Sequence, residues 1–483
     1  LKSQKNLEIF VMAKPVYAFE EADSKKRMLL GGKGAGLSEM TRLKLPVPPG
    51  FIITTEVCNK YYDNNKKLPK DLMSAVMKNI TKMEKKTGKK WNSTKNPLLV
   101  SVRSGAAISM PGMMDTILNL GLNEKTVEGF AEQTKNPRFS WDSYRRFIQL
   151  FGKVVFGVND EKFDHVLDSA KTKQGVSDDS KLNVESLKTI VSEYKKICEA
   201  HTKRKFPDSP KEQLELSIEA VFRSWMGERA IVYREKNNIT KDIANGTAVN
   251  VVTMVFGNMG DDSATGVVFT RNGHNGKKEI EGEYLINAQG EDVVAGVRTG
   301  KNIELLKKDM PKSHKELSNA CTKLEKHFRE PQDIEFTIEQ GKFYLLQTRT
   351  AKMSAAALVK TSVDMVKEKL IDKNRALTRI PAQQLEALLH RTMDESKIKD
   401  HKQVAKGIAA SPGAASGIVV FDVKKTIELG EAGKKIILVR KETKPEDVPA
   451  FFSAEGILTS LGGKSSHAAI VSRGMGKPCI VEI

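Results

Sequence analysis

The chain has 483 residues, of which 39% are hydrophobic, and a formal net charge of +19 at pH 7. This length suits about three domains with packed cores. No run of about eighteen apolar residues occurs, so the sequence predicts no membrane span. The lysine excess is dispersed and aromatic residues make up only 6%, which argues against a nucleic-acid-binding protein and for a solvated basic surface that attracts small anions.

The cysteine content indicates a reducing compartment. The four cysteines are far apart in the sequence and none forms a CxxC pair, so neither structural zinc nor a disulfide framework is expected. We therefore expect a cytoplasmic protein, with an organelle such as a plastid or glycosome left open.

The first part of the chain mixes strands with a long helical stretch. The first dozen residues are interpreted as a leader that precedes the folded part. Short apolar runs at 47–53 and 98–103 predict strands. Helical periodicity then dominates from about 122 to 235, which predicts a helical insertion. Strand character returns from residue 248 onward.

A glycine-rich stretch with one lysine lies in the first strand-rich region. Gly31–Leu37 offers a flexible backbone, and Lys33 can pair with a phosphate as a point charge. A phosphate-binding turn and an ordinary structural turn both stay open. Further along, Arg103 ends a predicted strand, and Ser109–Thr116 follows. That segment is interpreted either as a mobile loop over a ligand or as a core-packing methionine cluster.

The strongest local signal before residue 400 is a predicted hairpin. Apolar and polar residues alternate along 332–338, so Asp333 and Glu335 face the same way, about 7 Å apart. Two carboxylates at this spacing can hold Mg²⁺ that bridges nucleotide phosphates. On the next strand, Gln347 and Arg349 share a face, and Arg349 can grip a phosphate through its guanidinium group. The alternative is an exposed hairpin face with scattered charge.

The last part of the chain holds the most informative segment, residues 462–479. Glycines and two hydroxyl residues precede His467 at the start of a predicted helix, which ends near 474–476. Ser465 or Ser466 can cap this helix. The N–H groups at a helix start favour an anion, so His467 is well placed to accept a phosphoryl group. The alternative is an ordinary surface or core histidine.

This segment resembles the phosphohistidine signature of the phosphoenolpyruvate-utilising enzymes, and its tail Gly474–Cys479 is most similar to the pyruvate, phosphate dikinases. The resemblance covers nearly the whole chain and is most specific at 109–122 and 282–292. By this resemblance the chain is an α/β and α+β multidomain protein. The implied domains are an ATP-grasp nucleotide-binding domain at 13–352, a helical linker at 353–400 and a truncated, swivelling β/α phosphohistidine domain at 401–483.

The resemblance also implies roles for individual residues. Phosphates are held by Lys33, Arg103, Gln347 and Arg349, magnesium by Asp333 and Glu335, and Glu283 and Gln289 line the nucleotide cleft. The implied catalytic residues are His467, Arg349 and Arg103.

Four positions depart from the family pattern. Lys464, Ser465 and Ser472 stand where Met, Thr and Ala are usual, and Ala107 replaces an arginine, which is expected to weaken the nucleotide site. Plant members are regulated at the threonine matching Ser465, whereas helix capping is the simpler role for this serine.

The implied activity is the phosphate-loading half of the dikinase reaction. ATP would phosphorylate His467 through a pyrophosphohistidine, phosphate would remove the outer group, and the remaining phosphoryl group would later pass to pyruvate to form phosphoenolpyruvate. Pyruvate would bind a C-terminal barrel that this chain lacks, and the full-length enzyme is expected to be a homodimer. The alternatives are a phosphoenolpyruvate synthase, with water as acceptor, and a non-catalytic phosphohistidine carrier.

Overall fold

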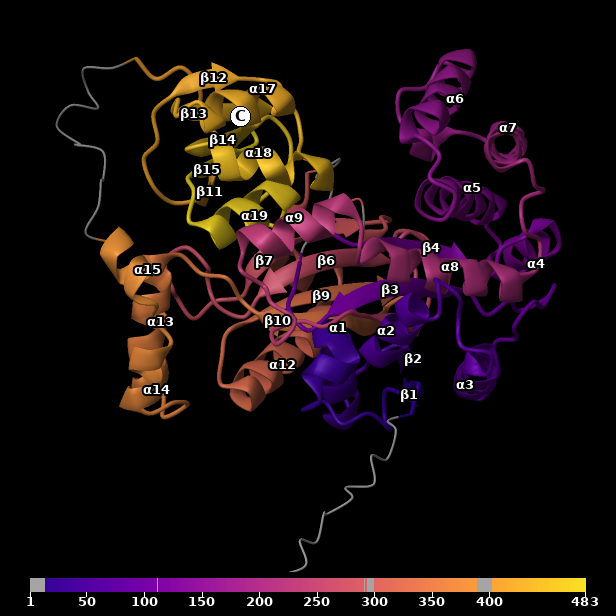
Figure 1. Ribbon diagram of the computed structural model, residues 1–483, viewed down its shortest axis with the longest axis horizontal. Coiled ribbons are helices and arrows are strands. Elements are labelled where there is room, and N and C mark those ends of the chain that lie inside the picture. The colour runs from indigo at the N-terminus through magenta and orange to yellow at the C-terminus, as the bar shows by residue number, and fades with distance from the viewer. Residues whose placement is uncertain (1–13, 111, 291, 293–298, 389–401) are drawn as a thin grey trace, which may run out of the picture.

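Three five-stranded sheets organise the chain in the computed structural model, which describes residues 14–110, 112–290, 292, 299–388 and 402–483 (Figure 1). The predicted leader and the end of the predicted linker, 389–400, lie outside these residues. We call residues 402–483 the C-terminal unit. Among the described residues, none of the helices combines the length and apolar character that a membrane crossing requires.

The first sheet is antiparallel throughout. Its order is β1 (Val16–Ala18), β2 (Gly50–Ile53), β5 (Thr247–Thr253), β3 (Val100–Ala106) and β4 (Thr116–Leu120). The helices near it in sequence are α1 (Arg27–Arg42), α2 (Thr55–Asp63) and α3 (Leu72–Thr87).

Between β4 and β5 the chain is helical, and residues that favour the start of a helix recur along it. Asparagine side chains cap four successive helices, with Asn123 forming a reciprocal capping box, and each such cap is worth about 1 kcal/mol. The elements are α4 (Glu124–Thr134), α5 (Pro137–Val154), α6 (Asp160–Gln174), η1 (Asp179–Lys181), α7 (Val184–Thr202), α8 (Pro210–Ser224) and α9 (Glu228–Lys236).

The second sheet is also antiparallel and contains the predicted hairpin. Its order is β10 (Lys342–Thr350), β9 (Gln332–Glu339), β6 (Ala264–Phe269), β7 (Glu281–Ile286) and β8 (Lys301–Asn302). Between β8 and β9 lie η2 (Ile303–Leu305), α11 (Leu306–Asp309) and α12 (Pro311–Phe328). After β10 come α13 (Ala355–Lys367), α14 (Lys373–Thr378) and α15 (Ala382–Ala387), which stand at one side of the molecule in Figure 1.

The C-terminal unit has a sheet whose strands β12, β13, β14 and β15 are parallel, so helices must connect them. Its strands, in spatial order, are β11 (Ile408–Ser411), β15 (Cys479–Val481), β14 (Gly456–Thr459), β13 (Ile436–Arg440) and β12 (Ile418–Val420). The connecting elements are α17 (Val423–Glu431), η3 (Pro445–Asp447), α18 (Val448–Ser453) and α19 (His467–Met475). Figure 1 shows this unit above the second sheet, with α19 on the side facing β7.

The glycine-rich stretch differs from its predicted form. Gly31–Leu37 lies within α1 and is not a loop, although Gly31 breaks the helical geometry with φ 69°. A Cβ at Gly31 would collide with the carbonyl of Gly105 on β3. Only glycine permits both this φ and this close approach, so α1 can pack its early turns against β3.

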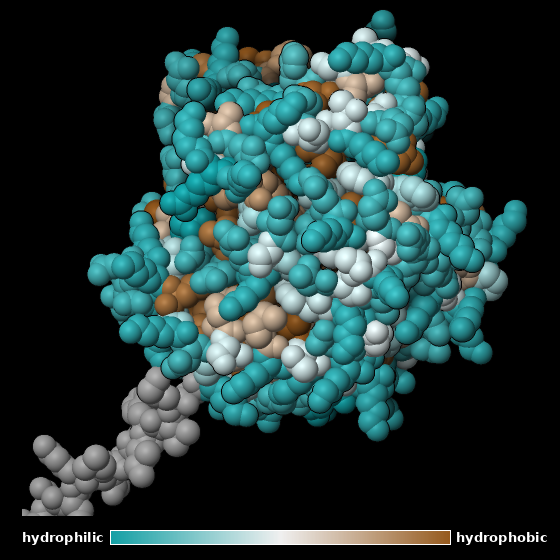
Figure 2. Space-filling view, turned by 90° about the vertical axis from the view of Figure 1, so that its right-hand side faces the viewer, coloured by the Kyte–Doolittle hydropathy of each residue, from teal (hydrophilic) through white to brown (hydrophobic). Residues whose placement is uncertain are grey.

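The segment before β4 forms part of the core. Met110 and Met113 are 5% and 3% exposed and belong to the main hydrophobic cluster. Of the two interpretations of Ser109–Thr116, methionine packing is therefore observed for these side chains. Figure 2 shows a face covered mainly by hydrophilic residues with scattered apolar patches, in keeping with a dispersed, solvated lysine surface.

Candidate functional site

Two rows of side chains lie on one face of the second sheet, because residues directly opposite each other on neighbouring strands project to the same side. The first row is Arg349, Asp333, Phe269 and Glu281. The second row is Gln347, Glu335, Val267 and Glu283. A bulge between Leu345 and Gln347 sets the register of β10 that produces these pairings. The rows bring together five of the predicted site residues.

Both predicted metal-binding carboxylates are in ion pairs. Arg349 Nε donates to Asp333 Oδ2 at 2.6 Å, and Arg103 Nη2 lies 3.5 Å from Glu335 Oε2. Because Arg103 is on β3 and Glu335 is on β9, the second ion pair joins the first and second sheets. Burial raises the pKa of Asp333 in spite of Arg349. Burial also opposes the charge on Glu335, but Arg103, Arg349 and Lys33 together hold the pKa of Glu335 below its ordinary value.

The residues present fit a cation only in part. Within the described ranges, no three Asp, Glu, His or Cys side chains gather closely enough to form a metal site by themselves. Asp333 Oδ1, however, is buried without a hydrogen-bond partner. An orphaned buried carboxylate oxygen is costly unless a ligand satisfies it. Asp333 and Glu335 therefore suit a Mg²⁺ ion whose other ligands come from phosphate oxygens or water.

Lys33 reaches the same cluster from α1. Burial lowers the pKa of Lys33 to about 7, with a further lowering by Arg103 and Arg349 and an opposing effect of Glu335. Lys33, Arg103 and Arg349 therefore repel one another in a partly desolvated place. Three crowded cations of this kind are typical of a site that binds a polyanion.

His467 is the first residue of α19, as the sequence predicts. The cap is Ser466, whose hydroxyl accepts the backbone N–H of Ala469, and the capping role expected for Ser465 is wrong. The His467 ring is 7% exposed, and burial lowers its pKa to about 4. At neutral pH the imidazole is therefore uncharged, and one ring nitrogen keeps a lone pair.

The two ring nitrogens of His467 have different surroundings. Nδ1 lies 3.3 Å from the hydroxyl of Thr443, whereas Nε2 is buried and has no hydrogen-bond partner. In the tautomer whose Nδ1–H donates to the Thr443 hydroxyl, the lone pair is on Nε2. Nε2 points to Gly112, where a Cβ would lie 3.2 Å away, so the methionine-rich loop borders the imidazole.

A carboxylate from the second sheet holds the loop before His467. Glu283 accepts the backbone N–H of Lys464 at 2.8 Å, and Lys464 Nζ pairs with Glu281 at 2.9 Å. A Cβ at Gly463 would collide with Glu283, so the close approach requires glycine. Burial raises the pKa of Glu283, and the Lys464 N–H opposes this. In this arrangement Glu283 contacts the C-terminal unit.

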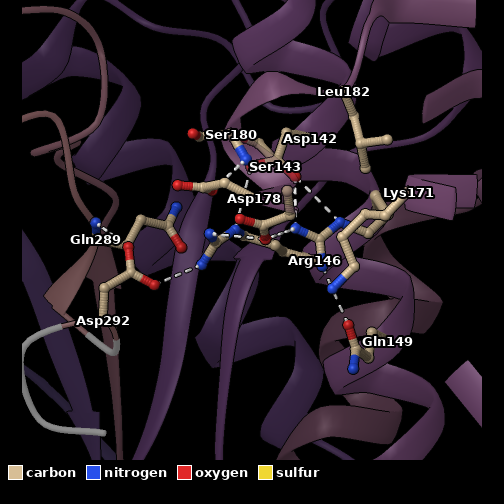
Figure 3. Close-up of polar contacts among 12 residues, drawn as sticks. Asp142, Ser143, Arg146, Gln149, Lys171, Asp178, Ser180, Leu182, Gln289 and Asp292 are labelled. Carbon is tan, nitrogen blue, oxygen red and sulfur yellow. Dashed lines mark hydrogen bonds and ion pairs between the residues drawn. The ribbon is translucent and has the colours of Figure 1, made fainter. Parts of the chain in front are cut away.

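Gln289 lies apart from the ionic cluster. Beyond the end of β7, its backbone N–H donates to Asp292, which accepts from Arg146 at 3.0 Å (Figure 3). Arg146 also pairs with Asp142 and Asp179, so the loop is fixed to α5 and η1. Gln289 is 4% exposed, and its amide has no hydrogen-bond partner among the described residues, so a ligand here could accept from its NH₂ group and donate to its carbonyl oxygen.

The structure therefore joins some predicted residues and leaves others separate. Within the part of the chain described, no hydrogen bond or ion pair connects His467 to the cluster around Asp333 and Glu335. Sequence reasoning missed Thr443, which lies 24 residues before its partner, and nothing in the pattern marked it. It also missed Glu281, although alternation along β7 puts Glu281 and Glu283 on the same face.

Comparison with known proteins decides the family. A family described as "Pyruvate phosphate dikinase, AMP/ATP-binding domain" matches residues 27–67, 64–315 and 310–370, and "PEP-utilising enzyme, mobile domain" matches 432–483. Pyruvate, phosphate dikinase of Entamoeba histolytica is 54% identical over 467 residues, 96% of this chain and 52% of that protein. The chain belongs to the pyruvate, phosphate dikinase family.

Other members of the family give the same picture. The Clostridium symbiosum pyruvate, phosphate dikinase is 51% identical over 97% of this chain and 54% of its own length. Chloroplastic pyruvate, phosphate dikinase 1 of Arabidopsis thaliana is 47% identical over 97% of this chain and 49% of its own length. The chain thus spans about half the length of these curated dikinase relatives. The mobile-domain match contains His467 and all of α19.

Proposed function

We propose that this chain is the phosphate-loading part of a pyruvate, phosphate dikinase. The observation that carries the proposal is the buried, uncharged His467, with Nε2 unpartnered, on a unit docked against a sheet with crowded cations and an orphaned carboxylate oxygen. In the manner of ATP-grasp enzymes, ATP would bind between the first and second sheets, in contact with Lys33, Arg103 and Arg349. A bare carrier of phosphohistidine would not need this cluster.

In the proposed mechanism His467 Nε2 attacks the β-phosphorus of ATP and AMP leaves. Arg103, Arg349 and Lys33 offset negative charge on the phosphates, which is the main demand of phosphoryl transfer. Mg²⁺ would supply further charge neutralisation from a position beside Asp333 and Glu335. Phosphate then removes the outer phosphoryl group as diphosphate, and the group left on His467 is passed to pyruvate by the complete protein.

The cluster and His467 are not in contact in this arrangement, so the mechanism requires movement of the C-terminal unit. The contacts that hold the unit at Glu281 and Glu283 are polar and can exchange for water, whereas its apolar side chains are continuous with the main hydrophobic cluster. A unit of this kind can leave the second sheet and return to it, which suits a carrier that serves separate sites. Dimerisation of the complete protein is part of the same proposal.

A single-turnover experiment tests the proposed function. Enzyme in excess of ATP, with Mg²⁺ and no phosphate, should release AMP, with the β- and γ-phosphoryl groups retained on the protein. Addition of phosphate should then release diphosphate. Release of ADP would contradict the dikinase function. Release of AMP that occurs only with water as the phosphoryl acceptor would contradict it as well.

The pKa of Lys33 predicts a pH dependence of ATP affinity. Lys33 is charged below about pH 7 and loses its proton above it. If only the charged form binds, the ATP dissociation constant should rise about tenfold between pH 6 and pH 8. Titration by calorimetry at both pH values checks this, and Lys33→Met should bind weakly with a flat profile. An unchanged slope in Lys33→Met would assign the pH dependence to another group.

A matched pair of serine variants separates capping from docking. Ser465 is 1% exposed and lies near Glu283, so Ser465→Asp would set two carboxylates against each other and should lower labelling of His467 at least about tenfold. Ser465→Ala should keep near-normal labelling, whereas Ser466→Ala should lose about 1 kcal/mol of unfolding free energy with its cap. Retained labelling in Ser465→Asp would remove any regulatory role for a phosphate at this serine.

A further inference from the structure

A group of basic side chains collects where α19 rests on the second sheet. Arg349, Asp333 and Phe269 stand side by side on β10, β9 and β6 and project to the same face. The guanidinium group of Arg473, from α19, lies 5.3 Å above the ring of Phe269. A residue of the C-terminal unit thus lies over the row that contains both Asp333 and Arg349.

Arg473 is only partly used by the fold. Its Nε and Nη2 donate to the carbonyl oxygen of Ala410, and Nη2 also donates to that of Lys464. Its Nη1 has no acceptor among the described residues and lies beside Gly273, 3.6 Å from where a Cβ would stand. Burial lowers the pKa of Arg473, and the charges of Glu281 and Asp333 oppose this. The free Nη1 is thus available to an anion.

Lys352 completes the group from the other side. It follows β10 and its amine packs against α19 so closely that a Cβ at Gly474 would collide with it. No described carboxylate pairs with Lys352, and the residue is exposed to solvent. Desolvation and the charge of Arg349 lower the pKa of Lys352, while Asp333 raises it. The amine therefore shares its electrostatic surroundings with the ion pair on the sheet.

The charges do not balance. Arg349, Lys352 and Arg473 lie near Asp333, while Arg103 and Arg349 share Glu335 and Lys464 engages Glu281. An excess of cations in one place is unfavourable unless an anion joins them. We propose that Lys352 and Arg473, with Arg349, bind the inorganic phosphate that acts as second substrate, in a site that is complete only when the C-terminal unit is docked. This inference rests on the proposed function.

The step served by this site is the second transfer. An oxygen of phosphate attacks the outer phosphorus of the pyrophosphoryl group on His467, and the bond from that phosphorus to the bridging oxygen breaks. The bridging oxygen stays with the phosphoryl group on His467, and diphosphate leaves with no net gain or loss of a proton. Lys352 and Arg473 would hold the attacking phosphate and offset its charge against that of the pyrophosphoryl group.

The variant Lys352→Met tests the site and leaves in place the contacts of Glu281 and Glu283 with the C-terminal unit. AMP release from ATP without phosphate should stay within about twofold of the parent, because that step does not use the site. The phosphate concentration that half-saturates diphosphate release should rise at least about tenfold. Lys352→Arg should restore it in part, and Lys360→Met, an exposed lysine on α13 paired with Asp364, is the matched control.

The outcomes separate the two proposals. If the parent protein releases no AMP, the proposed function fails, whatever the variant does. If Lys352→Met releases AMP normally and its phosphate dependence is unchanged, the proposed function stands and this site is wrong. If Lys352→Met slows AMP release as much as it raises the half-saturating phosphate concentration, Lys352 belongs to ATP binding. This outcome would also overturn the assignment to phosphate.

Discussion

His467→Ala is expected to abolish incorporation of label from ATP labelled at the β-phosphoryl group. Nε2 of His467 is the buried lone pair that the proposed mechanism uses, and alanine offers no nucleophile in its place. Because Thr443 is the single polar partner of the buried ring among the described residues, the variant should still fold, at a cost of a few kcal/mol for the cavity. The measurement is acid-labile, base-stable label on the protein after incubation with Mg²⁺ and phosphate.

The pH profile of the same experiment gives an internal check. The pKa of His467 is lowered to about 4 by burial, so its neutral form persists from pH 8 down to about pH 5. Labelling should therefore not fall near pH 6.5, where an ordinary histidine becomes charged. Equal labelling of His467→Ala and the parent would remove His467 from the reaction. A profile that falls near pH 6.5 would contradict the buried environment described for the ring.

Replacing either carboxylate of the cluster should give the second largest effect. Asp333→Ala or Glu335→Ala is expected to cut the rate of labelling at least about 100-fold, equivalent to about 2.7 kcal/mol of transition-state stabilisation. Each substitution removes a Mg²⁺ ligand of the proposed site and leaves Arg349 or Arg103 without its partner. Single-turnover labelling at saturating ATP is the measurement.

An exposed glutamate provides the control for this experiment. Glu304→Ala removes the same charge from η2, away from the cluster, and should label normally. A second readout distinguishes metal binding from folding, because raised Mg²⁺ should recover part of the activity of Glu335→Ala if metal affinity is what was lost. Near-normal labelling of both Asp333→Ala and Glu335→Ala would show that the hairpin carries only scattered surface charge.

Several features of the site follow from local sequence patterns. Alternation along 332–338 put Asp333 and Glu335 on one face, and the observed register confirms this. Glycines and hydroxyl residues predicted a helix beginning at His467, which is also observed. These predictions succeeded because strand alternation and helix capping depend on residues only two to four positions apart.

Other features of the site depend on contacts between residues far apart in the sequence, which local sequence patterns do not predict. Gly31–Leu37 was predicted as a flexible turn but lies in a helix, which Gly31 breaks where it approaches Gly105, more than seventy residues away. Ser466 caps α19 in place of Ser465, because Ser465 lies at the contact with Glu283.

The sequence by itself determined the family signature, the mixed α/β multidomain character and the identities of the charged residues on the hairpin. Only the tertiary structure decided which charges meet: Arg103 with Glu335 across two sheets, Glu283 with the loop before His467, and Arg473 with the row containing Asp333. Electrostatic interactions depend on distance in space and on burial, and neither is encoded in the spacing of residues along the chain. The lowered pKa of His467, which keeps its imidazole neutral and able to attack ATP, therefore comes from burial in the folded protein.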